Sequence, residues 1–415
     1  MPREIDNILQ EARNFTPNLQ YISDFDPDMP EFASIQAITY DGPDWGAGAM
    51  TTFAYLGIPE GASTENPVPA VVLVHGGGGV VYPRWVKMWM DRGYAAIAMS
   101  TRGLFPVAKN AGSRLPGDPG FRHGMYSIFQ KAGFADSPNE DSMKDPSLPL
   151  KERWITHALA KVILAHNVLR SLPQIDNAKI GITGISWGGV ITSLAITHDD
   201  RFAFAVPVYG SGYLDKALTY MHDRFSAPGN AAHFRAEDRF DAVKMPVLWM
   251  AWNDDNNFTV TSNSLSYLAT APNNPKTMLA LVHNMMHDHP CGWKPPIIGC
   301  FADWIVKGGA PLVTFLTQPS GNNAQATLNI PEGTGPITAT LYWIDAPMTY
   351  SYHDKYNIGI ANVTYMDQIW QSTPATLSGN QIFAELPANA CGYYLEIRYL
   401  LDGQEIVTTS VYTTR

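Results

Sequence analysis

The sequence predicts an α/β fold with a mostly parallel sheet flanked by helices, followed by a small all-β domain. Two observations indicate the first part: continuous apolar runs typical of strands buried on both faces, and helical patterns that alternate with them. A third observation indicates the second part. From about residue 318 the alternation stops, and short strand-like runs separated by turn residues follow.

The predicted elements of the α/β part, which we place at residues 1–317, follow one another along the chain. Strands are expected at 49–58, 70–75, 94–99, 178–183, 204–208, 247–251 and 277–282. Helices are expected at 5–14, 82–92, 154–172 and 189–197. We expect residues 1–45 to form a leader that packs against this domain. The segment 101–150, rich in Gly, Pro, Asp and Ser, is expected to be a long loop or cap.

The predicted β-rich part, residues 318–415, has the length of one small β-sandwich. Its strands are expected at 326–330, 337–344, 381–386, 393–400 and 405–412. Asp402 and Gly403 stand between the last two strands, and this dipeptide favours a tight hairpin turn. We expect this domain to be a structural buttress, with a carbohydrate-binding module or a dimerisation surface as alternatives.

Composition excludes several classes of function. The chain of 415 residues is 45% hydrophobic and 16% charged, so it can bury a large core in two domains. A net charge of −10 argues against nucleic acid and anionic membrane surfaces as partners. The sequence has no apolar run of ~20 residues and no apolar signal segment at its N-terminus. A cytoplasmic protein and a trimmed secreted protein both fit these observations.

Cysteine content gives no disulfide framework. The three cysteines, Cys291, Cys300 and Cys391, are expected to be free thiols. A bond between Cys291 and Cys300 is the alternative.

The run I-G-I-T-G-I-S-W-G-G at 180–189 contains the pattern G-x-S-x-G, centred on Ser186. In a nucleophile elbow this pattern places a serine on a sharp turn between a strand and a helix. Small residues are needed on both sides because the turn brings backbones close together. An ordinary glycine-rich turn is the alternative, but the strand expected before Ser186 and the helix expected after it favour a nucleophile.

A serine hydroxyl needs a base, and the base needs an orienting acid. In α/β-hydrolases these partners follow the serine in the order acid, then histidine. Asp254 and Asp255 come directly after the strand expected at 247–251, where catalytic groups of parallel sheets are found. We prefer Asp254 as the acid, with Asp255 as the alternative, and expect the other aspartate to cap the next helix.

The histidine is expected on the loop after the last strand of the α/β part. That loop holds His283, His287 and His289, and we choose His287 as the base, with His289 second. A metal site made of these three histidines and Asp288 is a rival interpretation, because imidazole and carboxylate both suit zinc. It leaves the serine pattern unexplained, so we expect no metal and no other cofactor.

The oxyanion of an acyl-transfer reaction needs backbone N–H donors. One is expected from Trp187, the residue after the serine. The other is expected from Gly77 or Gly78 in the run H-G-G-G-G at 75–79, which follows an early strand as the H-G-G-G loop does in esterases. This run lacks both G-K-[ST] and the G-x-G-x-x-G spacing, which argues against a nucleotide cofactor.

Tryptophans lie near all three proposed catalytic positions in the sequence: Trp187, Trp252 and Trp293. Indole faces often stack on sugar rings, while packing in the core is the alternative for each. We take Trp252 and Trp293 as candidate substrate-binding residues.

Several motifs together resemble one group of proteins. V-L-V-H-G-G-G-G at 72–79, G-I-T-G-I-S-W-G-G-V at 181–190 and H-N-M-M-H-D-H-P-C-G-W at 283–293 are similar to the acetyl xylan esterase and dienelactone-hydrolase-like group of α/β-hydrolases. The resemblance covers residues 50–310 well and the C-terminal part loosely. It implies an α/β-hydrolase fold and a serine carboxylester hydrolase, often one acting on acylated plant polysaccharides.

Within this resemblance, Ser186 matches the nucleophile, Asp254 the acid and His287 the base. One departure concerns the acid: such proteins usually have Gly before the Asn-Asp pair and Pro after it, whereas this chain has Trp252 and Thr259. We therefore expect a serine esterase that removes acyl groups from a carbohydrate or a small ester. The rivals are a serine peptidase of the prolyl-oligopeptidase type and a catalytically silent carbohydrate-binding protein.

Overall fold

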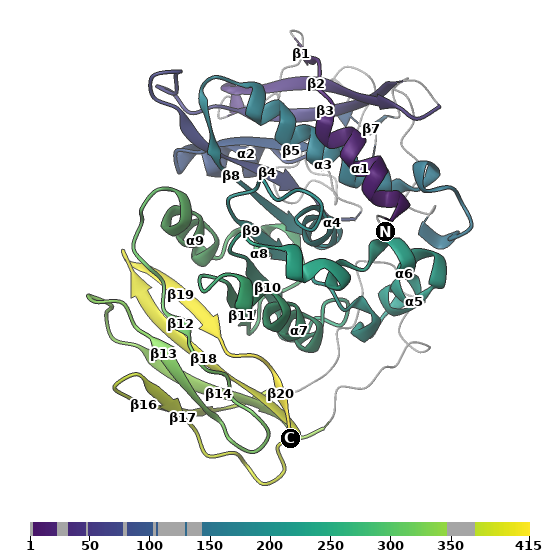
Figure 1. The fold of residues 1–415 in the computed structure, drawn as a ribbon. Coiled ribbons are helices and arrows are strands. Elements are labelled where there is room, and N and C mark those ends of the chain that lie inside the picture. Colours follow the sequence, from purple (N-terminus) through teal and green to yellow (C-terminus); the bar gives the residue numbers. More distant parts are fainter. Residues whose placement is uncertain are drawn as a thin grey trace. The chain divides into compact units, whose positions relative to one another are not determined.

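The computed structural model describes residues 3–22, 32–46, 49–77, 81–102, 105–106, 129–130, 143–346 and 370–415 (Figure 1). The chain divides into two compact units. The first comprises Met1–Ala205 and Ala227–Phe234, and the second comprises Val206–Ser226 and Arg235–Arg415. The domain boundary expected at residue 318 therefore falls inside the second unit. Most of the expected long loop at 101–150 lies outside the described residues.

The first unit is built on strands in the order β1-β2-β3-β5-β4-β8. They are β1 (Leu19–Tyr21), β2 (Ile35–Asp44), β3 (Ala49–Gly57), β4 (Val68–Val74), β5 (Ala95–Met99) and β8 (Ile175–Ile185). The pairs from β1 to β5 are antiparallel, whereas β5, β4 and β8 run parallel. The strands expected at 49–58, 70–75, 94–99 and 178–183 are confirmed. The sequence did not predict β1 and β2, which lie within the expected leader.

The helices described in the first unit are α1 (Glu4–Asn14), α2 (Pro83–Asp91), α3 (Trp154–Ser171), α4 (Trp187–Ala195) and α6 (Pro228–Phe234). The same unit contains a 3₁₀ turn at Leu150–Glu152 and two short strands, β6 (Phe105–Pro106) and β7 (Phe129–Gln130). The four helices expected from the sequence are confirmed as α1 to α4. Helix α3 is buried at every residue from Trp154 to Leu169. Because this helix is buried on all sides, it lies in the core of the first unit.

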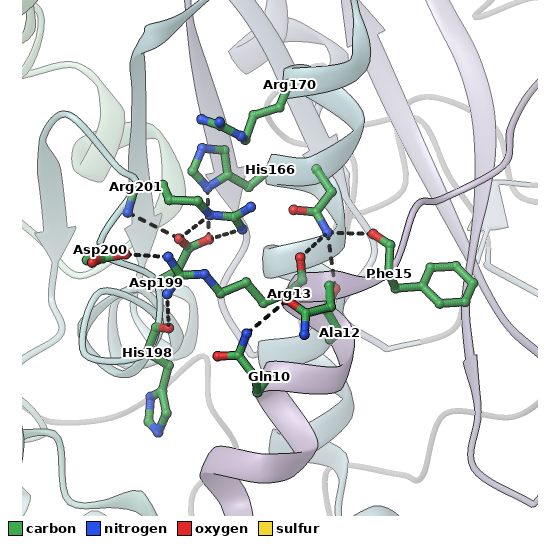
Figure 2. Close-up of polar contacts among 12 residues, drawn as sticks. Gln10, Ala12, Arg13, Phe15, His166, Arg170, His198, Asp199, Asp200 and Arg201 are labelled. Atoms are coloured by element: carbon green, nitrogen blue, oxygen red, sulfur yellow. Dashed lines mark hydrogen bonds and ion pairs between the residues drawn. The ribbon is translucent and has the colours of Figure 1, made fainter.

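The N-terminal helix α1 is held against α3 by packing and by a polar cap (Figure 2). Its apolar side chains Ile5, Ile8, Leu9 and Ala12 are buried. The side-chain amide of Asn167 on α3 donates to the carbonyls of Ala12, Arg13 and Phe15 at 3.1, 3.2 and 2.8 Å. The last carbonyls of a helix have no partner within the helix, so Asn167 satisfies groups that burial would otherwise penalise.

A buried charged network lies beside this contact (Figure 2). Asp199 accepts hydrogen bonds from Nδ1 of His166 at 2.9 Å and from Nε and Nη2 of Arg201 at 2.7 and 2.6 Å. Burial alone raises the pKa of Asp199, but the bonds from Arg201 and His166 outweigh it and hold the pKa well below its usual range. The carboxylate is therefore charged and fully paired, as a buried charge must be.

The α/β part of the second unit contains three parallel strands in the order β9-β10-β11. They are β9 (Ala205–Val208), β10 (Leu248–Trp252) and β11 (Met278–Val282), all expected from the sequence. The helices are α5 (Tyr220–Ser226), α7 (Val260–Thr270), α8 (His289–Trp293) and α9 (Pro296–Val306), with 3₁₀ turns at Leu214–Lys216, Ala236–Ala242 and Ala271–Asn273. Trp252 pairs with Val282, so the loops that carry the candidate acid and base begin at the same edge.

The C-terminal region forms two antiparallel sheets. One has the order β12-β13-β17-β16, with β12 (Thr314–Phe315), β13 (Gln325–Asn329), β16 (Thr376–Ser378) and β17 (Gln381–Phe383). The other has the order β15-β14-β18-β19, with β14 (Thr338–Ile344), β15 (Gln371–Pro374), β18 (Gly392–Leu401), β19 (Gln404–Thr409) and β20 (Thr413–Thr414), which pairs with β18. The predicted hairpin is confirmed: Leu401 pairs with Gln404, and Asp402 and Gly403 both have positive φ.

Strand β11 is hydrogen-bonded to side chains of β19. The hydroxyl of Thr408 donates to the carbonyl of Leu279 at 3.0 Å, and the hydroxyl of Thr409 accepts from the N–H of Leu281 at 3.1 Å. An uncovered edge strand is prone to pair with other chains, and β19 protects β11 from this.

The three cysteines are free thiols, as expected from the sequence. Within the described part of the chain, the helices are either too short or too polar to cross a membrane.

Candidate active site

Ser186 occupies a strained turn between β8 and α4. It is the N-cap of α4, with φ 60° and ψ −121°, immediately after the strand ends at Ile185. Such a backbone is rare for a residue with a side chain and costs about 1–3 kcal/mol. The expected strand–turn–helix context of the G-x-S-x-G pattern is therefore present, which is the geometry of a nucleophile elbow.

Close backbone contacts explain the two glycines of the pattern. A Cβ atom on Gly184 would lie 2.1 Å from the carbonyl oxygen of Gly188. A Cβ atom on Gly188 would lie 2.0 Å from the carbonyl oxygen of Val74 at the end of β4. Backbone oxygens cannot move away as a flexible side chain can, so these positions exclude every residue except glycine.

The expected oxyanion donors Gly77 and Trp187 lie side by side in the first unit. A Cβ atom on Gly77 would approach Cδ1 of Trp187 to 2.4 Å. The loop after β4 thus runs directly against the residue that follows Ser186. Gly78, the other candidate donor, lies outside the described residues.

His75 fixes the start of this loop, a role that sequence reasoning missed. Its Nε2 accepts from the backbone N–H of Thr101 at 3.1 Å, and its Nδ1 donates to the carbonyl of Gly76 at 2.9 Å. Burial lowers the pKa of His75 to about 4, so the ring is neutral near pH 7. The carbonyl of Thr101 in turn accepts from the indole of Trp154, whose ring packs edge-on against Trp187.

The second unit brings together a histidine and a carboxylate. Nδ1 of His287 lies 2.6 Å from Oδ2 of Asp255, which is fully buried. Oδ1 of Asp255 accepts from the backbone N–H groups of Asn257 and Phe258 at 2.9 and 3.0 Å. The carboxylate is thereby fixed, and it holds the imidazole in the tautomer that carries its proton on Nδ1. This is the arrangement by which an acid orients a catalytic base.

The carboxylate that contacts His287 is thus that of Asp255, the alternative left open by the sequence, and not that of the preferred Asp254. Among the residues that the structure describes, none forms a hydrogen bond with the buried Oδ1 of Asp254. Burial raises the pKa of this carboxyl to about 7, against a smaller lowering effect of the Trp370 indole. The expectation that the second aspartate caps the next helix is wrong, because Thr259 caps α7 through its side-chain oxygen. The two aspartates are adjacent in sequence, and nothing local to them predicts which one packs against His287.

The neighbouring groups of the histidine loop have separate partners. Nδ1 of His283 lies 3.2 Å from the side-chain amide of Asn253, and Asp288 caps α8 by accepting from the N–H of Cys291. The ring of His289 packs against Trp293. Among the residues that the structure describes, no group of three or more His, Cys, Asp or Glu side chains is placed to hold a metal ion.

Burial distinguishes the three tryptophans near the proposed catalytic positions, of which Trp252 and Trp293 are the candidate substrate-binding residues. Trp187 and Trp293 each expose 6% of their surface, which fits packing in the core. Trp252, at the end of β10, is half-buried and retains exposed surface. Trp252 is thus the tryptophan of this set that can offer part of its ring to a ligand.

Tyr209 is a further residue of the site that sequence reasoning missed. It follows β9 directly, and its ring stacks on the imidazole of His287 at 4.5 Å between centroids and 17° between planes. The signal available in the sequence was positional: Tyr209, like Asn253 and His283, is the first residue after a strand that ends at this edge.

Comparison with known proteins gives a family model and a set of solved structures. Residues 149–294, which include Ser186, Asp255 and His287, match the model of the prolyl oligopeptidase family. No curated protein matches the chain.

Among solved structures, an acetyl xylan esterase from a Paenibacillus species is 16% identical, with 74% of this chain and 95% of that chain covered and a TM-score of 0.50. A protein described as a putative dienelactone hydrolase from Klebsiella pneumoniae is 19% identical. The match covers 63% of this chain and 90% of that chain, with a TM-score of 0.41. An acylaminoacyl peptidase from Pyrococcus horikoshii is 17% identical. The match covers 60% of this chain and 37% of that chain, also with a TM-score of 0.41.

Strand order, elbow and comparisons agree on the class of protein. The chain has the α/β-hydrolase fold, followed by additional antiparallel sheets at its C-terminus. The resemblance to α/β-hydrolases noted in the sequence is thus confirmed at the level of the fold.

Proposed function

We propose that the protein is a serine hydrolase of carboxylic esters and that Ser186, His287 and Asp255 form its catalytic triad. The observation that carries this proposal is the hydrogen bond between His287 and the buried carboxylate of Asp255, combined with a serine on a strained elbow. A strained backbone and a buried carboxylate each cost free energy, and acyl transfer accounts for the presence of both in one chain.

The proposed reaction has two halves. Oγ of Ser186 attacks the acyl carbonyl while Nε2 of His287 accepts its proton, and the collapsing intermediate expels the alcohol, which receives that proton. Water then attacks the acyl-enzyme with His287 again as base, releasing the carboxylic acid and restoring Ser186. Asp255 keeps Nδ1 protonated throughout and stabilises the imidazolium.

The oxyanion that forms in each half needs two donors. We assign them to the backbone N–H groups of Trp187 and Gly77, because the elbow and the loop after β4 lie directly against each other. The neutral ring of His75 supports the assignment, since it fixes this loop without adding a charge.

We further propose an acetyl-like acyl group on a carbohydrate or small alcohol as the substrate. This assignment is supported by the motifs shared with acetyl xylan esterase-like proteins and by the fold of the Paenibacillus acetyl xylan esterase. The partly exposed indole of Trp252 is suited to contact the alcohol side of such a substrate.

Peptide hydrolysis is the second candidate function. It is supported by the match of residues 149–294 to the prolyl oligopeptidase family, whose span contains all three proposed catalytic residues. The same triad cleaves amides, so the substrate assay rather than the triad must separate the two functions.

The deciding experiment compares the wild type with Ser186→Ala on three substrates: p-nitrophenyl acetate, acetylated xylan and a peptide p-nitroanilide. We expect hydrolysis of both esters to fall roughly 10⁵-fold or more in the variant, with little activity on the anilide in either protein. Circular dichroism serves as the control for folding. Equal ester turnover in both proteins would contradict the triad, and a dominant anilidase activity would favour the peptidase.

A third outcome would support a silent binding protein. In that case a fluorophosphonate probe would leave Ser186 unlabelled while acetylated xylan still bound. Labelling of the wild type and not of Ser186→Ala excludes this alternative.

A further inference from the structure

We propose that Tyr209 is a positioning residue for the catalytic histidine, acting through both its ring and its hydroxyl. The inference rests on the proposed function, because it assumes that His287 is the base. Tyr209 lies on the loop after β9, a different segment from those that carry His287 and Asp255. It would thus be a further component of the acid–base machinery.

The first observation is the stacked ring. The planes of the Tyr209 ring and the His287 imidazole are within 17° of parallel, with centroids 4.5 Å apart. Stacking occupies a face of the imidazole and not its edge, so the ring nitrogens can form in-plane hydrogen bonds, as Nδ1 does with Asp255. The ring of Phe258 also stacks on this imidazole, with 5.9 Å between centroids and 23° between planes. The closer ring of Tyr209, together with Phe258, therefore restricts the rotation of the imidazole that Asp255 alone leaves open.

The second observation is the phenol hydroxyl, which donates to the carbonyl of Met286 at 2.6 Å. Met286 directly precedes His287, so this bond fixes the backbone from which the catalytic side chain extends. Two ends of one tyrosine thus contact consecutive residues, one through the backbone and one through the ring.

The third observation is backbone strain. Tyr209 has φ 48°, in the left-handed region that few residues other than glycine adopt. Its N–H is held by the carbonyl of Met250 on β10 at 2.8 Å, so the conformation is enforced by the sheet. Left-handed backbone at a bulky aromatic residue is expected where the side-chain direction matters.

The contact also has an electrostatic consequence. The face of an aromatic ring carries partial negative charge and attracts a cation placed over it. The imidazole of His287 becomes a cation when it takes the serine proton, so the stack stabilises the charge that develops in the transition state. In the part of the chain that the structure describes, the contacts of the imidazole include two titratable groups, Asp255 and Tyr209. Asp288, from the histidine's own segment, caps α8.

The test uses Tyr209→Phe, Tyr209→Leu and the control Tyr267→Phe. Tyr267 on α7 also has a buried ring and a hydroxyl bond, to Gln318 at 3.1 Å, but belongs to a different cluster. We expect kcat on p-nitrophenyl acetate to fall about 3- to 10-fold in Tyr209→Phe and roughly 5- to 30-fold in Tyr209→Leu, with KM near the wild-type value. Tyr267→Phe should keep the wild-type kcat.

The pH profile separates positioning from general loss of structure. In Tyr209→Leu the acidic limb of kcat/KM should move to lower pH, because the imidazolium loses the stabilising ring. In Tyr209→Phe the limb should stay in place, since the ring is retained. Thermal unfolding of each variant shows how much of any loss of activity comes from a loss of global stability.

A readout without turnover distinguishes a failure of this proposal from a failure of the esterase assignment. The imidazole of His287 can be titrated by NMR in the Ser186→Ala background, with and without Tyr209→Leu. A shift of the titration to lower pH supports the proposal, and identical titrations together with identical kcat values overturn it. An inactive wild type whose His287 titration still moves would contradict the esterase function and leave the ring's effect on the histidine supported.

Discussion

The elbow of the first unit and the loops of the second unit that carry the proposed acid and base (the acid–base loops) are held in place by different kinds of contact. At the elbow the backbone itself is constrained: Gly184 and Gly188 are in contact with carbonyl oxygens that no Cβ atom could approach. In the acid–base loops the constraint comes from side chains, as Asp255 and Tyr209 hold His287 from two directions. Backbone constraints leave a signature in the sequence, whereas side-chain constraints depend on which residues meet in the fold.

The largest effect is expected where the side chain of Asp255 holds His287. Asp255→Asn should lower kcat for ester hydrolysis roughly 10³- to 10⁴-fold, because an amide in this position favours the wrong imidazole tautomer. The matched control is Asp254→Asn, one residue away, which should keep a kcat close to that of the wild type. Steady-state kinetics on p-nitrophenyl acetate measures both, and a greater loss in Asp254→Asn would return the acid role to Asp254.

A substitution at the elbow tests the close backbone contact of Gly188. Gly188→Ala should cost roughly 3 kcal/mol or more of unfolding free energy, because the new methyl group meets the carbonyl of Val74. The same change at Gly335 meets its nearest atom, the carbonyl oxygen of Leu400, at 3.9 Å and should be nearly neutral. Denaturant unfolding compares the two, and equal stabilities would show that the elbow relaxes more easily than its geometry indicates.

Acid should lower the free energy of unfolding through buried histidines of the first unit. His75 has a pKa near 4 in the folded protein, below the usual 6.5, so the unfolded chain binds the proton more readily. The stability that this contributes is complete above about pH 6.5 and is lost as the pH falls towards 4. The loss is up to about 3 kcal/mol.

His157, also in the first unit, has the same low pKa of about 4 because of burial and should add to this loss. Hydrogen exchange at pH 7 and pH 5 should therefore show protection falling first around β4 and α3. The substitution His75→Gln should flatten the pH dependence of the unfolding free energy. A profile as steep as that of the wild type would assign the acid sensitivity to other groups.

Particular elements show how far sequence reasoning could go. The strands at 49–58, 94–99 and 277–282 and the helix at 154–172 were predictable because burial imposes a repeating pattern on consecutive residues. Strands β1 and β2 were missed because they lie in a polar, proline-punctuated leader, where the pairing of β1 with β2 and of β2 with β3 outweighs weak local preference. Strands β15 and β16 were missed for the same reason, since both are short and largely exposed.

The sequence by itself determined the rhythm of strands and helices, the hairpin at Asp402 and the elbow around Ser186, because each depends on residues that are neighbours in the chain. Tertiary structure decided that Asp255 rather than Asp254 meets His287, and that Tyr209 stacks on the same ring. Consecutive residues in a loop point in different directions, and which of them reaches a histidine 32 positions away is set by how β9, β10 and β11 align.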